Sequence, residues 1–190
     1  MVVLSPAKHQ LRQFLVENKT PLPVEIAVQP EALGIGDAVL RCWQGEAVGV
    51  LLPDDVVLET EHWTRLIDLH DRHGAAALCV RPVPLETTSR FGIAECDGDR
   101  VLSLVEKPPS GTSNSNLAIF GRYVVTEAVI EGLRAVRASR ELELTDGFAA
   151  AVGVPPGVRA IQFTGEIYDC GTPAAYADST SRFPERAPSS

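Results

Sequence analysis

Short apolar runs alternate with helical patterns along the first part of the chain, and this alternation constrains the fold more than any other feature. Each run is followed within two residues by a proline (Val2–Leu4, Pro23–Val28, Gly49–Leu52 and Ala75–Val80). Between the runs, apolar residues recur at helical spacing, as at Leu11, Phe14 and Leu15. Strands that alternate with helices favour right-handed βαβ units. The sequence therefore predicts the α/β class, with a mostly parallel, Rossmann-like sheet flanked by helices.

The stretch Gly49–Asp55 (GVLLPDD) places two carboxylates directly after one of these runs. An apolar run ended by a breaker is typical of a buried strand of a parallel sheet. Ligands of open α/β sheets lie outside the carboxyl ends of the strands, where carboxylates can hold a metal ion. The same acids could equally be solvated at an ordinary strand exit or cap the next helix. Residue type and position leave both interpretations open.

The composition limits the kinds of partner. With 190 residues, 45% of them hydrophobic, the chain suits one soluble domain. A formal net charge of -8 argues against nucleic acid but not against a small phosphorylated ligand. No apolar stretch approaches the roughly 20 residues that span a bilayer, and the N-terminus is no signal peptide. The four cysteines are widely spaced, which predicts neither zinc nor disulfides and favours the reducing cytoplasm.

Two further places combine glycines or charges at predicted strand ends. In Leu33–Ala38 (LGIGDA), backbone N–H groups at Gly34 could approach a ligand closely, although a glycine pair before a helix is more often a plain turn. Glu106 and Lys107 end a strand before two prolines. This glutamate could accept hydrogen bonds from sugar hydroxyls and the lysine could bind a phosphate, or the two could form a surface ion pair.

Asp169 is a second aspartate at a predicted strand end. It could share a metal ion with Asp54, or it could belong only to the turn that follows it. His62, His70 and His73 lie on one predicted helix, and we interpret them as a solvated helix face rather than a metal site.

Five strings occur in the chain in the order LLPDDVVL, LSLVEKP, SNLAIFGRYV, ELTD and YDCG. Together they resemble the bacterial UTP–glucose-1-phosphate uridylyltransferases, which belong to the sugar-nucleotide transferase group. The resemblance runs from about Val2 to Tyr176. It implies a nucleotide-diphospho-sugar transferase fold over residues 1–176, followed by a disordered tail at residues 177–190.

The resemblance also implies a reaction and a cofactor. In that family, UTP and glucose 1-phosphate give UDP-glucose and pyrophosphate, and positioning and charge neutralisation by Mg²⁺ carry the transfer. By match to the family's motifs, Asp54 and Asp169 hold Mg²⁺ against the phosphates, and Asp55 points away. UTP or UDP-glucose and glucose 1-phosphate are therefore the expected partners.

The remaining matched residues contact the substrates. Glu106 is expected to bind sugar hydroxyls, and Lys107 is expected to act as the catalytic cation that binds the sugar phosphate. Gln29 and Gly34 are expected to contact the uracil. Gly92 is expected to let the backbone approach the sugar.

The chain also departs from the family's pattern. In the family a glycine-rich loop, G-x-G-T-R, precedes all these strings, and Met1 falls where the family's second strand begins. The resemblance therefore implies a domain incomplete at its N-terminus, in which the central first strand is missing and two strand edges stay unpaired. Ile35 and Asp37 replace a leucine and a histidine of the family's glycine turn. Asp37 adds negative charge near the expected nucleotide.

Three hypotheses result. In the first, the chain is an active uridylyltransferase whose loop is encoded upstream or supplied by another chain. In the second, it is a non-catalytic relative that binds a sugar phosphate or nucleotide sugar and regulates an active homologue. In the third, it is a degraded fragment with no function, and this is opposed by the retained Asp54, Glu106, Lys107 and Asp169. Unpaired strand edges favour a homo-oligomer or association with a homologous chain.

Overall fold

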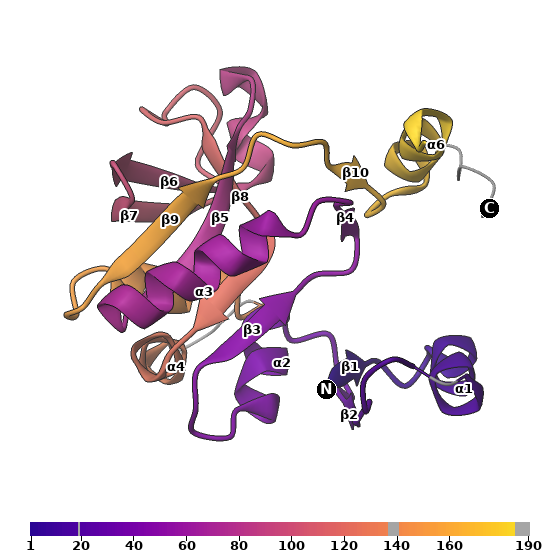
Figure 1. The fold of residues 1–190 in the computed structure, drawn as a ribbon. Helices are drawn as coiled ribbons and strands as arrows, with labels where there is room; N and C mark the ends of the chain where they lie inside the picture. The colour runs from indigo at the N-terminus through magenta and orange to yellow at the C-terminus, as the bar shows by residue number, and fades with distance from the viewer. Residues whose placement is uncertain (19, 137–140, 185–190) are drawn as a thin grey trace.

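A six-stranded sheet forms the centre of the computed structural model, which describes residues 1–18, 20–136 and 141–184 (Figure 1). The strands follow the order β3-β8-β5-β9-β7-β6. In chain order they are β3 (Val48–Leu51), β5 (Ala76–Pro82), β6 (Gly92–Asp97), β7 (Arg100–Glu106), β8 (Leu117–Val125) and β9 (Val158–Gln162). Two two-stranded ribbons lie outside this sheet: β1 (Val2–Leu4) with β2 (Ile26–Val28), and β4 (Asp55–Val56) with β10 (Tyr168–Asp169).

Helices cover both faces of the central sheet. Apolar side chains of α3 pack on one face, and those of α2, α4 and α5 pack on the other. The helices are α1 (His9–Glu17), α2 (Ile35–Cys42), α3 (Glu61–His73), α4 (Glu127–Ala135), α5 (Leu144–Ala151) and α6 (Pro173–Arg182), with a 3₁₀ turn η1 at Leu85–Arg90. The predicted α/β class, with a central sheet flanked by helices, is confirmed.

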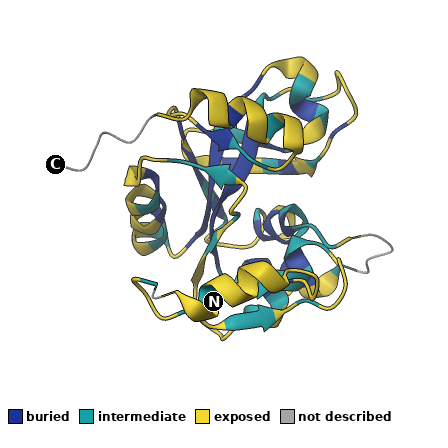
Figure 2. Ribbon diagram, turned by 90° about the vertical axis from the view of Figure 1, so that its right-hand side faces the viewer, coloured by how far each residue is buried: buried dark blue, intermediate teal, exposed yellow. Residues whose placement is uncertain are grey.

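β5 forms the middle of the core (Figure 2). Its side chains alternate, with Ala76, Leu78 and Val80 in the core cluster under α4 and α5, and Ala77 and Cys79 in the cluster under α3. A strand covered on both faces needs apolar residues at every position. This explains why the sequence is continuously apolar there.

The predicted mostly parallel sheet is wrong for the hydrogen-bonded pairs. Among the described residues, only β1–β2 and β5–β9 pair in parallel, and the other six pairings are antiparallel. One cause is β8, which lies between β3 and β5 and is antiparallel to both. The other is the antiparallel hairpin of β6 and β7, whose Asp97-Gly98-Asp99 turn has the composition typical of tight hairpins.

β3 is not the buried strand that its apolar run predicted. Within the described part of the chain it pairs only with β8, and Val48 and Leu51 are 40% and 51% exposed. β1 and β2 form a separate ribbon, so the sheet is interrupted between that ribbon and β3. One edge of β3 therefore has no strand partner among the described residues.

Two local expectations also need correction. The tail predicted from residue 177 begins inside α6, which continues to Arg182, and residues 185–190 lie outside the described residues. His62 is only 4% exposed and lies against the rings of Trp63 and Phe163, so it does not belong to a solvated face. None of the helices in the described ranges has the length and apolar character of a membrane span.

Candidate functional site

The ribbon of β4 and β10 brings two distant aspartates together. β4 follows the exit of β3, and its Asp55 pairs with Asp169 of β10. The backbone N–H of Cys170 also donates to the carbonyl oxygen of Asp54 at 2.7 Å. As a result, Asp54 Oδ2 and Asp169 Oδ1 each lie 3.3 Å from the position that a Cβ on Gly171 would occupy. Asp169 Oδ1 also accepts a hydrogen bond from the backbone N–H of Gly171 at 2.8 Å. One oxygen of each carboxylate thus lies beside the same glycine, whose missing side chain leaves this space open.

Asp55 has a different role from its neighbour. Its Oδ2 accepts a hydrogen bond from the backbone N–H of Gly121 at 3.0 Å, and its backbone carbonyl accepts one from Arg122. Burial raises the pKa of the Asp55 carboxyl, an effect that the Gly121 N–H partly offsets. Asp55 therefore ties β4 to β8, while Asp54 is exposed.

A second group of polar atoms surrounds Gly92 at the start of β6. A Cβ on this residue would lie 3.0 Å from both Glu106 Oε2 and Thr145 Oγ1, and 3.2 Å from Ile119 Cδ1. Gly92 and Glu106 are register partners in the β6–β7 hairpin, and Thr145 lies in the first turn of α5. A carboxylate and a hydroxyl therefore converge on a bare stretch of backbone, a combination that suits a ligand with hydroxyl groups.

Lys107 follows this glutamate in an unusual backbone conformation. Its φ of 43° is the only positive φ of a non-glycine residue among those described. Residues in this region are uncommon, and such strain concentrates at functional sites. The Lys107 Nζ lies 3.2 Å from Glu106 Oε1 and 3.6 Å from Glu143 Oε1, and its side chain is 55% exposed. The hydrogen bond to Glu106 raises the pKa of Lys107, so the ammonium stays charged.

Glu143 and Thr145 were not among the predicted site residues. Glu143 is the N-cap of α5 in a capping box with Asp146, which fixes its side chain beside Lys107. Burial raises the pKa of its carboxyl, and the charge of Glu106 adds to this effect. The string ELTD, which spans Glu143–Asp146, was the available signal. It carries both residues, but it did not reveal that they reach β6 and β7.

A third group surrounds Gln29, directly after β2. The Gln29 Nε2 donates to the carbonyl oxygen of Gly34 at 2.9 Å and to Asp37 Oδ2 at 2.8 Å. Gly34 is the N-cap of α2 with a φ of 93°, and the backbone of Leu142 occupies the place of its missing Cβ. Packing against Leu142 thus explains the glycine without any ligand.

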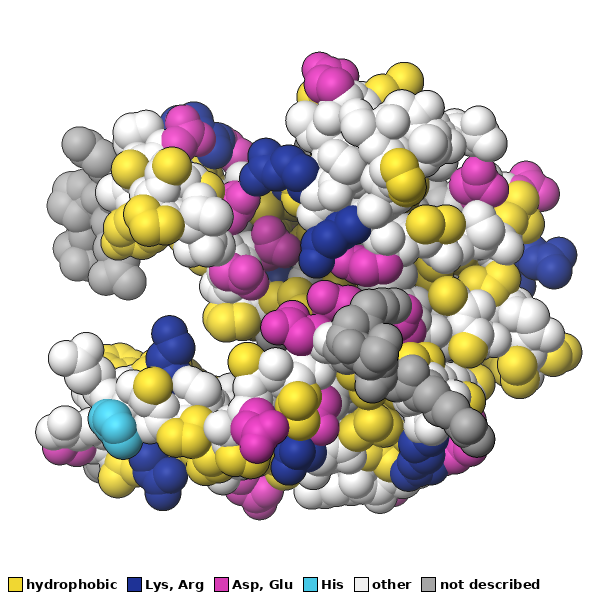
Figure 3. Space-filling model, turned by 180° about the vertical axis from the view of Figure 1, so that it is seen from behind, with side chains coloured by type: hydrophobic (Ala, Val, Ile, Leu, Met, Phe, Trp, Pro, Cys, Tyr) yellow, Lys and Arg dark blue, Asp and Glu magenta, His cyan; other side chains and the backbone are white. Residues whose placement is uncertain are grey.

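The predicted residues therefore form three groups: Asp54 with Asp169; Gly92, Glu106 and Lys107; and Gln29 with Gly34. Seen from behind, the molecule is hollowed at its middle, and acidic and basic side chains gather there (Figure 3). In the described ranges, no three His, Cys, Asp or Glu side chains form a metal-binding group. Two protein carboxylates are consistent with a cation that takes its other ligands from phosphates or water.

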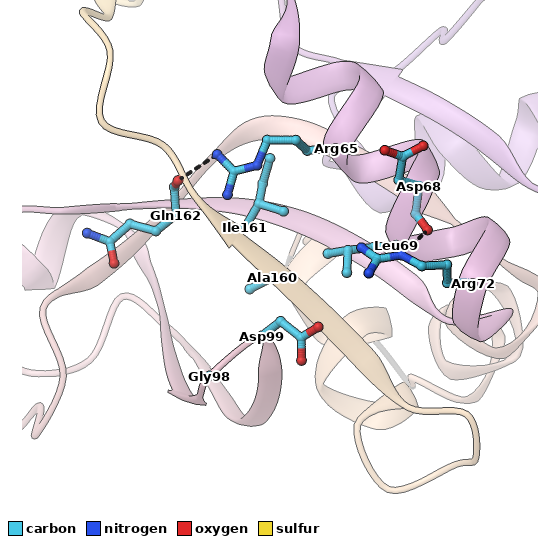
Figure 4. Close-up of a pocket in the computed structure, with 9 residues that line it drawn as sticks. All are labelled: Arg65, Asp68, Leu69, Arg72, Gly98, Asp99, Ala160, Ile161 and Gln162. Carbon is cyan, nitrogen blue, oxygen red and sulfur yellow. Dashed lines mark hydrogen bonds between the residues drawn. The ribbon is translucent and has the colours of Figure 1, made fainter.

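A separate cavity of about 350 Å³ lies between α3 and β9, beside the β6–β7 turn (Figure 4). Arg65, Arg72, Asp68 and Asp99 line it over a floor of apolar residues. None of the predicted site residues lines this cavity, and its two arginines are matched by two aspartates. We therefore place the candidate site at the strand ends, where the polar groups converge.

The chain belongs to the nucleotidyl transferase family, whose sequence model matches residues 1–185. Within it, the chain is similar to UTP–glucose-1-phosphate uridylyltransferases. It is 32% identical to that of Haemophilus influenzae, over 90% of this chain and 66% of the relative, and 38% identical to that of Bacillus subtilis, over 82% and 56%. The resemblance that the five sequence strings suggested is thus confirmed, and the family shown for this chain is the nucleotidyl transferase family.

A solved structure of a UTP-bound UGPase from Acinetobacter baumannii has the same fold. Its TM-score is 0.76 at 27% sequence identity, and the match covers 94% of this chain and 66% of that one. The chain thus spans less than two thirds of the length of these relatives.

Proposed function

We propose that this chain acts as a UTP–glucose-1-phosphate uridylyltransferase, making UDP-glucose and pyrophosphate from UTP and glucose 1-phosphate. The observation that carries this proposal is the approach of Asp54 and Asp169 to one common space, although they are far apart in the sequence. Similar proteins with that activity support it. A cytoplasmic location, expected from four cysteines that are all free, is part of the proposal.

The donor set at Asp54 and Asp169 fits Mg²⁺. This cation prefers oxygen ligands and is usually bound by one or two carboxylates together with substrate phosphates. The two carboxylates would hold the ion, which when bound neutralises charge on the phosphates of the nucleotide. Asp55 is outside this set because its carboxylate lies at Gly121 and is not among the groups beside Gly171.

The sugar phosphate is assigned to the group around Gly92. Glu106 Oε2 is placed to accept hydrogen bonds from sugar hydroxyls, and the Thr145 hydroxyl offers both a donor and an acceptor. The Lys107 ammonium is held at this site by Glu106 and Glu143 and is assigned to the phosphate. Gln29 and Gly34 are assigned to the uracil.

In the proposed reaction a phosphate oxygen of glucose 1-phosphate attacks the α-phosphorus of UTP. One P–O bond forms there, while the bond from the α-phosphorus to the β-phosphate oxygen breaks and pyrophosphate leaves with the electron pair. The residues assigned here perform no covalent chemistry. Their contribution is to align the attacking oxygen and to keep a positive charge, that of Lys107, near the reacting phosphates.

A second candidate is a non-catalytic relative that binds a sugar phosphate or nucleotide sugar and associates with a homologous chain. The open edge of β3 favours it, because a strand edge with unpaired N–H and C=O groups can accept a strand of another chain. A homo-oligomer would use the same edge.

Pyrophosphate release separates the two candidates. The purified chain is mixed with UTP, glucose 1-phosphate and Mg²⁺, and circular dichroism verifies that it is folded. Release that is lost in Asp54→Asn supports the transferase. A folded chain that releases nothing but binds UDP-glucose supports the binding protein instead.

A further inference from the structure

The side-chain amide of Gln29 has its orientation fixed by two acceptors. Its nitrogen carries two hydrogens, and these point to the Gly34 carbonyl oxygen and to Asp37 Oδ2 at 2.9 and 2.8 Å. A carbonyl oxygen and an ionised carboxylate only accept hydrogen bonds. If the amide were flipped, its oxygen would face these two acceptors, and neither contact would contain a hydrogen. The orientation therefore follows from the chemistry of the partners.

The amide oxygen of Gln29 is left as the free end of the side chain. No described residue donates a hydrogen bond to it, and it is not among the buried polar atoms that lack a partner. It is thus accessible and can only accept a hydrogen bond. Whatever binds there must offer a donor.

Asp37 is itself held in place. Its Oδ2 also accepts a bond from Arg41 Nε at 2.7 Å, one turn further along α2. This bond lowers the pKa of the Asp37 carboxyl, which therefore stays ionised and acceptor-only near neutral pH. Arg41, Asp37 and Gln29 form a chain of contacts in which each fixes the next.

We propose that Asp37 is a positioning residue that sets base specificity, by fixing Gln29 so that it accepts a hydrogen bond from an N–H at the Watson–Crick edge of the base. Uracil and thymine carry such a donor at N3, whereas the N3 atom of cytosine is an acceptor and would meet the amide oxygen unpaired. An unpaired polar contact of this kind discriminates strongly between similar ligands. The inference rests on the proposed function, in which Gln29 contacts the base.

Calorimetric titration of the full chain with UTP and with CTP, each with Mg²⁺, tests the proposal. We expect wild type to bind UTP more tightly, and Asp37→Ala to reduce the UTP-to-CTP affinity ratio about fivefold, the effect of one hydrogen bond. Asp37→Asn keeps an acceptor oxygen and should preserve the ratio. Glu31→Ala is the matched control, because this neighbouring carboxylate interacts with Arg41 but makes no described bond to Gln29.

The outcomes separate this inference from the proposed function. A folded Asp37→Ala chain with an unchanged ratio overturns the role of Asp37. Wild type that binds both nucleotides equally overturns it as well, while leaving nucleotide binding in place. Wild type that binds neither removes both proposals. Should Asp37→Ala not fold, NMR of wild type decides: fast solvent exchange of both Gln29 Nε2 protons would contradict the fixed amide.

Discussion

Two strand ends of the candidate site carry the same kind of residue in opposite settings. After β3, Asp54 meets a second carboxylate, that of Asp169. At the end of β7, Glu106 meets the ammonium of Lys107, which Glu143 also contacts. Carboxylates that lie near one another favour a cation beside them. The proposed function therefore supplies a cation from solution at the first end, whereas the second end has the ammonium of Lys107.

Removing one carboxylate at the first end should have the largest effect. Asp54→Asn is expected to abolish Mg²⁺-dependent nucleotide-sugar binding, because a single remaining carboxylate holds the ion poorly. Titration of UDP-glucose with and without Mg²⁺ measures this. Asp55→Asn is the control, since its side chain bonds to Gly121 and not to the shared space. Equal losses in the two variants would show that the two aspartates do not have separate roles.

The second end should respond to loss of its cation. Lys107→Ala is expected to weaken glucose 1-phosphate binding by about 1.5–3 kcal/mol, the range of a hydrogen bond to a charged group. Mg²⁺ dependence should be retained, because the lysine is not part of the aspartate pair. Lys8→Ala, at the exposed N-cap of α1, provides a control of equal charge change. Unchanged affinity in Lys107→Ala would exclude the phosphate role.

A smaller change at the same end tests its shape. The methyl group of Gly92→Ala would lie 3.0 Å from Glu106 Oε2 and from Thr145 Oγ1, so these groups must shift. We expect a loss of about 1 kcal/mol in sugar-phosphate affinity, at the lower end of the cost of overpacking. Gly153→Ala is the matched control, because nothing lies within 4 Å of its added methyl group. Tight binding by Gly92→Ala would show that the sugar does not use this space.

The smallest effect concerns Asp55, the partly buried neighbour of the proposed metal ligand Asp54. Its pKa is raised above the ordinary 3.8 of the unfolded chain, so the folded state holds the proton more tightly. Its contribution to the free energy of unfolding should therefore fall as pH rises from about 3.8 to the raised pKa. Urea denaturation across this range should show a flatter profile for Asp55→Asn than for wild type. An identical slope would show that Asp55 does not titrate as inferred.

The sequence predicted elements whose signal is local. The continuous apolar run of β5 predicted a strand, because a strand buried on both faces needs apolar residues throughout. The Asp-Gly turn between β6 and β7 is a local signal of the same kind, because it makes a tight reversal. The exposed β3 has an apolar run as well, yet burial depends on which strands lie beside it. A run of apolar residues does not report its neighbours, which is why the buried-strand and mostly parallel predictions were wrong.

The candidate site shows the same division. Residue patterns located the acids, glycines and lysine at strand ends and pointed to the family to which the chain belongs. The folded chain was needed to show that Asp54 and Asp169 lie beside one glycine while Asp55 binds Gly121, and that Glu143 and Thr145 join the group at Gly92. These contacts join residues far apart in the chain. They depend on strand register and helix packing, which local residue patterns do not specify.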